Sequence, residues 1–221
     1  MGSIARSAAN LITTSGVVLK GAVNNDSFDN VTALPSAAGA DGITFISSQT
    51  ASSSASISFT SGITSTYKAY KFVFVNCHPQ TDNVNFEFNG STDSGSNYNV
   101  TKTTTFVDAS HQESGADYAF GYATGRDLAQ SSSFQQISGY QLQNDNDSSV
   151  SGILTLFNPS STTYVKHFIS DVNSVANDAA HTSWRALMAG YFNTTSAINA
   201  VRFQMSSGNI DAGTIYMYGI K

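Results

Sequence analysis

Short runs in which apolar and small polar residues alternate constrain the fold of this 221-residue chain more than any other feature. Apolar residues occupy every second position in Ser54–Phe59, in Asn83–Phe88 and in Val201–Ser206. Because successive side chains of a β-strand point to opposite faces, each run predicts a strand with one buried face and one wet face. Tyr70–Val75 is apolar almost throughout, which predicts a central strand covered on both faces.

Further short strands are expected along the rest of the chain, separated by clusters of turn-forming residues. They lie near Tyr98–Val107, Tyr118–Ala123, Phe134–Leu142, Val150–Phe157, Tyr164–Val172, Thr182–Phe192, Ala197–Met205 and Gly213–Tyr218. No helical period is visible, and 34 serines with 22 threonines oppose long helices. The pattern predicts an all-β fold, an antiparallel β-sandwich of the jelly-roll-like kind.

The first 41 residues differ from the remainder. Ile4–Ala40 shows neither the strand period nor the helix period, and turn-formers interrupt it repeatedly. We interpret residues 1–41 as an extended N-terminal arm that anchors the protein to a particle, followed by a β-sandwich domain over residues 42–221. The arm carries apolar side chains suited to docking on a partner, namely Ile12, Val18, Leu19, Phe28 and Leu34.

Composition excludes several partners. Only 11% of the residues are charged, the net charge is −5 and the isoelectric point is near 5.1. A nucleic-acid binder would need a basic stripe, so no nucleic-acid partner is expected. No window has the length of apolar chain that a membrane helix requires, so no membrane partner is expected either. One cysteine excludes an intramolecular disulfide.

No catalytic, cofactor or metal site is predicted. The four histidines do not follow metal-ligand spacing; they are His78, His111, His167 and His181. No Gly-x-Ser-x-Gly elbow is present, and glutamate occurs only at Glu87 and Glu113. The loop Asn144–Asp147 offers oxygen ligands of the type that Ca²⁺ prefers, but it lacks the glycine and glutamate of an EF-hand. A hairpin turn held by its own side chains is the preferred interpretation, and ion binding is the alternative.

Four segments carry a resemblance to a known group of proteins. Ser206–Lys221 resembles the closing strand pair of small virion structural proteins of tailed phages, especially phages of marine and cyanobacterial hosts. Leu156–Phe168, Asp29–Pro35 and Ile57–Ile63 are similar to the same group. In the closing segment, Gly208 and Gly213 are expected to bracket a tight hairpin turn.

This resemblance implies a non-enzymatic virion protein on the particle exterior, either capsid decoration (cement) or a fibre component, with other virion proteins as partners. The alternative is a tail fibre or tail-accessory protein whose sandwich binds a host-surface carbohydrate. Such a binding module would expose tyrosines or Trp184 on one face, whereas a glycan depolymerase would bring two acids together in a groove. Abundant aromatic residues with few charges also predict self-association, as a trimer.

Overall fold

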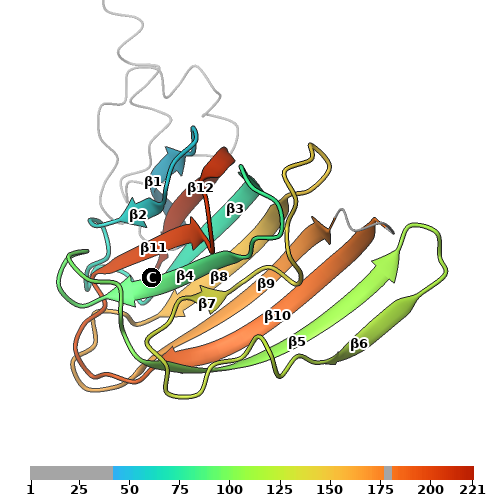
Figure 1. Cartoon of the computed structure of the whole chain (residues 1–221). Coiled ribbons are helices and arrows are strands. Elements are labelled where there is room, and N and C mark those ends of the chain that lie inside the picture. The colour runs from blue at the N-terminus through green and yellow to red at the C-terminus, as the bar shows by residue number, and fades with distance from the viewer. Residues whose placement is uncertain (1–41, 177–180) are drawn as a thin grey trace, which may run out of the picture. The chain divides into compact units, whose positions relative to one another are not determined.

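The computed structural model describes residues 42–176 and 181–221, and Gly42–Lys221 form a compact unit of their own. The described residues fold into two antiparallel sheets that pack as a sandwich (Figure 1). The larger sheet contains, in spatial order, β1 (Ile43–Thr50), β12 (Ile210–Ile220), β3 (Ala69–Pro79), β8 (Val150–Phe157), β9 (Lys166–Ala176), β10 (Thr182–Phe192), β5 (Lys102–Gln112) and β6 (Tyr118–Tyr122). The smaller sheet contains β2 (Ile57–Phe59), β11 (Ala200–Met205), β4 (Phe86–Ser91) and β7 (Gln135–Gln136).

The strand order is that of a jelly roll with two insertions. Without β5, β6, β9 and β10, the remaining strands form two sheets with the orders β1-β12-β3-β8 and β2-β11-β4-β7. In chain order these strands alternate between the sheets, except that β4 and β7 are neighbours in the smaller sheet. This is the connectivity of a jelly roll. The inserted strands all join the larger sheet beyond β8, so this sheet is twice as wide as its partner (Figure 1). The expected all-β, jelly-roll-like sandwich is confirmed.

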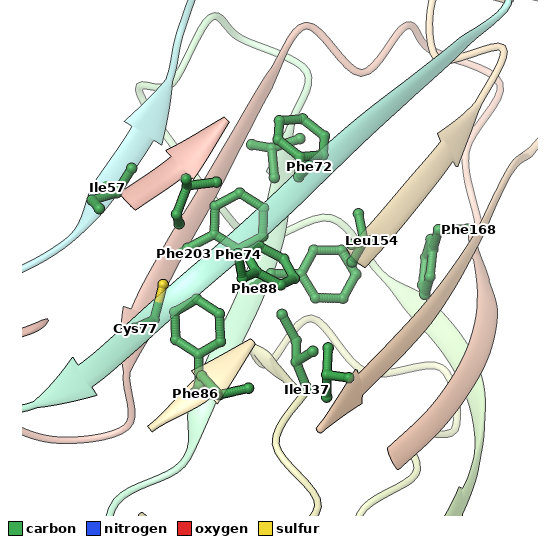
Figure 2. Close-up of a cluster of buried hydrophobic side chains, with 14 of the residues drawn as sticks. Ile57, Phe72, Phe74, Cys77, Phe86, Phe88, Ile137, Leu154, Phe168 and Phe203 are labelled. Carbon is green, nitrogen blue, oxygen red and sulfur yellow. The ribbon is translucent and has the colours of Figure 1, made fainter. Parts of the chain in front are cut away.

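A cluster of phenylalanine rings joins the two sheets (Figure 2). Phe203 lies on β11, inside the smaller sheet, and is fully buried. Its ring centroid lies 5.1 Å from that of Phe74 and 5.3 Å from that of Phe72, both on β3 of the opposite sheet. It also contacts Phe59, Phe86 and Phe88, at 6.4, 6.0 and 6.3 Å. Rings at these separations gain contact energy beyond the burial of their area.

Two sequence-based expectations about the large sheet are wrong. β3 is a central strand, but only one of its faces is covered: Tyr70, Phe72 and Phe74 are buried, whereas Val75 on the other face is 42% exposed. The last two strands do not form a hairpin either, because β11 and β12 lie in different sheets. The alternation of apolar residues in β11 and β12 would be the same in a hairpin and in two separate sheets, so the sequence pattern does not distinguish the two arrangements.

Gly213 lies within β12, not in a turn. It coincides with a bulge in the β12–β3 ladder and has a φ of +114°. A Cβ at this position would lie 2.5 Å from the carbonyl oxygen of Asn76 and 2.6 Å from the Cα of Cys77. Glycine is therefore required here because the neighbouring backbone comes so close.

Two buried lysines flank Phe192 of β10. Lys102 on β5 and Lys166 on β9 are its register partners on either side, and neither lysine is exposed to solvent. The Lys102 ammonium donates to the Val100 and Ser133 carbonyls, and the Lys166 ammonium donates to the Tyr164 and Thr194 carbonyls. Burial lowers the pKa of Lys102 to about 7 and also lowers that of Lys166. The two ammonium groups thus hold the backbone next to β5 and β9 through carbonyl hydrogen bonds, but removing their charge from water costs free energy.

We predict that Phe203→Ala lowers the free energy of unfolding by about 3–5 kcal/mol, because a cavity would open between the sheets. Tyr164→Ala is the control, since this ring is 70% exposed and its loss should cost less than about 0.5 kcal/mol. Urea unfolding followed by circular dichroism measures both. Equal effects of the two substitutions would show that the sandwich does not depend on Phe203.

Stability should pass through a minimum near pH 7. Burial raises the pKa of Glu87 to about 7, so below pH 7 the folded chain holds a proton that the unfolded chain loses, and stability falls as the pH rises towards 7. The lowered pKa of Lys102 has the opposite effect above pH 7, where the unfolded chain holds the extra proton and stability rises with pH.

Urea unfolding of wild type and Lys102→Met at pH 7 and pH 8.5 tests this expectation. The wild type should gain about 1 kcal/mol or more relative to the variant between these two values. The comparison cancels the titration of shared groups that do not interact with Lys102. The Lys102 charge lowers the pKa of Glu87, so its removal changes the Glu87 titration in the direction that adds to the expected difference. A constant difference between the chains would show that the Lys102 ammonium keeps its ordinary proton affinity.

Candidate functional site

One face of the eight-stranded sheet points away from the smaller sheet and carries exposed apolar side chains near its centre; we call it the open face. A single row of register partners crosses it from β3 to β6 and consists of Val73, Ile153, Asp171, Leu187, Val107 and Tyr122. Part of this row, with Ile169, Thr105 and Lys71, lines a hollow of about 570 Å³. Ile169 is 50% exposed there. An exposed hollow whose lining surface is mostly apolar is typical of a surface that binds another protein.

Charges on the open face are paired or sparse. Arg185 donates to Asp171 from Nε at 3.0 Å and from Nη2 at 2.7 Å. This contact holds the pKa of Asp171 below its ordinary value. The pair is exposed to solvent, so it contributes little to stability.

Strand β6 forms an unprotected edge of the same sheet. Its sequence, Tyr118–Tyr122, contains no charged residue and no proline. Among the described residues, β5 is its one neighbour in the sheet. Tyr118 and Phe120 are each 78% exposed, and Tyr122 lies on the same side of the strand. Exposed edges normally carry charges, proline or bulges that prevent pairing with another chain. This edge lacks the first two and offers aromatic rings.

A second hollow, of about 540 Å³, lies where the inserted strands extend past β7, the edge of the smaller sheet. We call it the aromatic hollow, and it is lined by Asn85, Asp108, Ala119, Tyr122, Ala123, Thr124, Gly125, Arg126, Gln136, Tyr140, Gln141 and Trp184. Asp108, Ala119 and Trp184 come from β5, β6 and β10, whereas Arg126 and Tyr140 come from segments on either side of β7. Its size is typical of small-ligand sites.

Arg126 lines the aromatic hollow, and its guanidinium lies between an acid and two aromatic rings. It forms an ion pair with Asp108 and lies 5.3 Å from the ring centroid of Trp184 and 5.7 Å from that of Tyr140. Burial lowers its pKa, and Tyr140 opposes this effect. Buried Gln135 fixes the backbone of this segment by donating to the Arg126 carbonyl at 2.8 Å. The cation is therefore held by charge pairing and by aromatic faces together.

Trp184 and Tyr140 form a stacked pair, with centroids 5.1 Å apart and planes at 13°. Gly139 permits this arrangement, because a Cβ there would lie 2.8 Å from the Cβ of Trp184. The indole Nε1 is buried and has no hydrogen-bond acceptor among the described residues. An unsatisfied donor of this kind destabilises a fold, so stability alone does not account for a tryptophan at this position.

Two amide side chains at this hollow take no part in the protein's own hydrogen bonding. Asn85 and Gln141 line the hollow. Within residues 42–176 and 181–221, neither side-chain amide makes a hydrogen bond, in contrast to Gln136, whose Nε2 donates to the Ser138 carbonyl at 2.8 Å. Each amide can both donate and accept a hydrogen bond from a ligand.

The residues singled out from sequence are distributed as follows. The arm residues Ile12, Val18, Leu19, Phe28 and Leu34 lie outside the described residues. In the loop Asn144–Asp147, the Ser148 amide donates to the Asp145 carbonyl at 2.9 Å, and the Asn144 amide donates to Asp82 Oδ1 at 2.8 Å. Cys77 is buried, which raises the pKa of its thiol to about 12.

Neither surface brings two acids together. Among residues 42–176 and 181–221, Asp171 is the one acid that lines the open-face hollow, and Asp108 is the one that lines the aromatic hollow. No group of three or more histidine, cysteine, aspartate or glutamate side chains with metal-binding geometry occurs in the described part of the chain. The same part contains no helix that could span a membrane.

Sequence reasoning identified Trp184 as a residue to inspect for sugar binding but did not identify Arg126, Asp108 or Tyr140. These three are far apart in the chain and have no motif spacing. The alternation of Tyr118, Phe120 and Tyr122 was visible as a strand pattern. The same pattern is typical of strands with one buried face, so it did not reveal that these three aromatic side chains are exposed.

Comparison of the chain with protein-family models, with curated proteins and with solved structures gives no match.

Proposed function

We propose that this chain is a non-enzymatic structural protein of a bacteriophage particle, located on the exterior as capsid decoration or as a fibre component, and anchored by its N-terminal arm. The observation that carries the proposal is the unprotected, aromatic edge strand β6 beside the apolar open face. A stable soluble monomer has no use for such a surface, whereas an assembling subunit has. Viral capsid domains are among the uses of jelly rolls, which supports the proposal by fold-level analogy.

The composition also suits a particle exterior. With 11% charged residues, contacts to neighbouring subunits would rely on packing and hydrogen bonds, which salt weakens far less than exposed ion pairs. The resemblance of Ser206–Lys221 to tailed-phage virion proteins points to the same setting. A tail fibre or tail accessory is the alternative location, and the copy number per particle distinguishes it from capsid decoration.

We predict that the purified chain self-associates as a trimer of 23.3 kDa subunits. Phe120→Ser should weaken the association about 30-fold or more, because buried aromatic anchors dominate interfaces. Light scattering over a concentration series measures both. Tyr164→Ser is the matched control, since Tyr164 is 70% exposed but lies in the loop between β8 and β9 and not on β6. A monomer at every concentration would overturn this part of the proposal.

Deletion of residues 4–40 tests the anchoring role of the arm. Gly42–Lys221 carry both sheets and the phenylalanine cluster, so the β-type circular dichroism and the cooperative melting should be nearly unchanged. Incorporation into particles in a complementation assay should be lost, because the apolar anchors are removed. Unfolding of the truncated chain would assign the segment to the sandwich, and normal incorporation would assign the anchor to the β domain.

A further inference from the structure

We propose that the aromatic hollow binds a neutral saccharide. This inference goes beyond the structural role, because assembly uses the open face and the β6 edge and requires no ligand in the hollow. Trp184, Tyr140, Arg126, Asp108, Asn85 and Gln141 form the proposed site.

The aromatic pair supplies the apolar part of the site. A sugar ring presents C–H groups on one face, and such a face packs on aromatic side chains, which carry negative charge density over the ring. Trp184 and Tyr140 are both partly exposed and line the hollow as a nearly parallel stack, so the pair offers apolar ring surface to a ligand. The Arg126 guanidinium contacts both rings, and Gly139 leaves room for the Trp184 side chain.

The amides supply the polar part. Sugar hydroxyls act as donor and acceptor at once, and a primary amide offers both functions to them. Asn85 and Gln141 line the hollow, and their side-chain amides make no hydrogen bond with any described residue. Their hydrogen-bonding capacity is therefore available to a ligand without loss of an internal contact.

The charge balance argues for a neutral ligand. Arg126 and Asp108 neutralise each other within the hollow, and no other charged side chain lines it. A phosphate or a carboxylate would need a cation that is not already paired with an acid. A nucleotide or an acidic sugar would therefore have to break the ion pair, whereas a neutral sugar leaves it intact.

Tryptophan fluorescence provides a direct test, because Trp184 is the single tryptophan of the chain. The full chain is titrated with maltotriose, N-acetyllactosamine, mannotriose and chitotriose, and with trigalacturonate as the acidic comparison. We expect a saturable change of the Trp184 emission with at least one of the neutral oligosaccharides. No change with any of them, or a change with trigalacturonate alone, would overturn the proposal.

Variants of the rim amides locate the binding. The double variant Asn85→Ala/Gln141→Ala should weaken the binding about tenfold or more, because hydrogen bonds to two groups are lost. Asn146→Ala is the matched control: Asn146 is an exposed amide outside the hollow, and its removal should leave the affinity unchanged. Equal affinity of wild type and double variant, with circular dichroism showing both folded, would place the sugar elsewhere and overturn the proposal. Particle incorporation is a separate readout, so failure here leaves the structural role standing.

Discussion

The contact between Phe203 and the rings around it is the interaction on which the rest of the structure depends. It joins the interior of the four-stranded sheet to β3, an interior strand of the larger sheet (Figure 2). Because the smaller sheet is only half as wide, it covers the jelly-roll strands but not the whole inner face of the inserted strands. The aromatic hollow lies at this unmatched margin. The position of the hollow therefore follows from the widths of the two sheets.

The inserted strands serve two surfaces at once. On β10, Leu187 points to the open face, whereas Trp184 and Ala186 point to the inner side; on β5, Val107 and Asp108 divide in the same way. This division follows from the period of two along a strand. The proposed assembly surface and the proposed ligand site thus lie on opposite faces of one sheet, and β6 borders both, because Ala119 and Tyr122 line the hollow.

Sequence reasoning succeeded where the pattern is local. Val150–Phe157 and Thr182–Phe192 have the predicted bounds, because turn residues limit them at both ends. It did not identify β1, whose alternation is weak, and it predicted two covered faces for Tyr70–Val75. An apolar run shows that a strand is central in its sheet, but the covering of its second face depends on whether another layer packs there. In this fold none of the described residues forms such a layer over Val75.

By itself, the sequence determined the all-β class, most strand positions and the low charge, since these depend on period and composition. Only the tertiary structure decided which sheet each strand joins, and it places β11 and β12 in different sheets. It also decided which aromatic side chains are exposed, such as those of β6. It also brought Asp108, Arg126 and Trp184 together from distant segments. These features depend on long-range pairing and on the relative widths of the sheets. A strand pattern carries no information on either, because its period is the same in every sheet position.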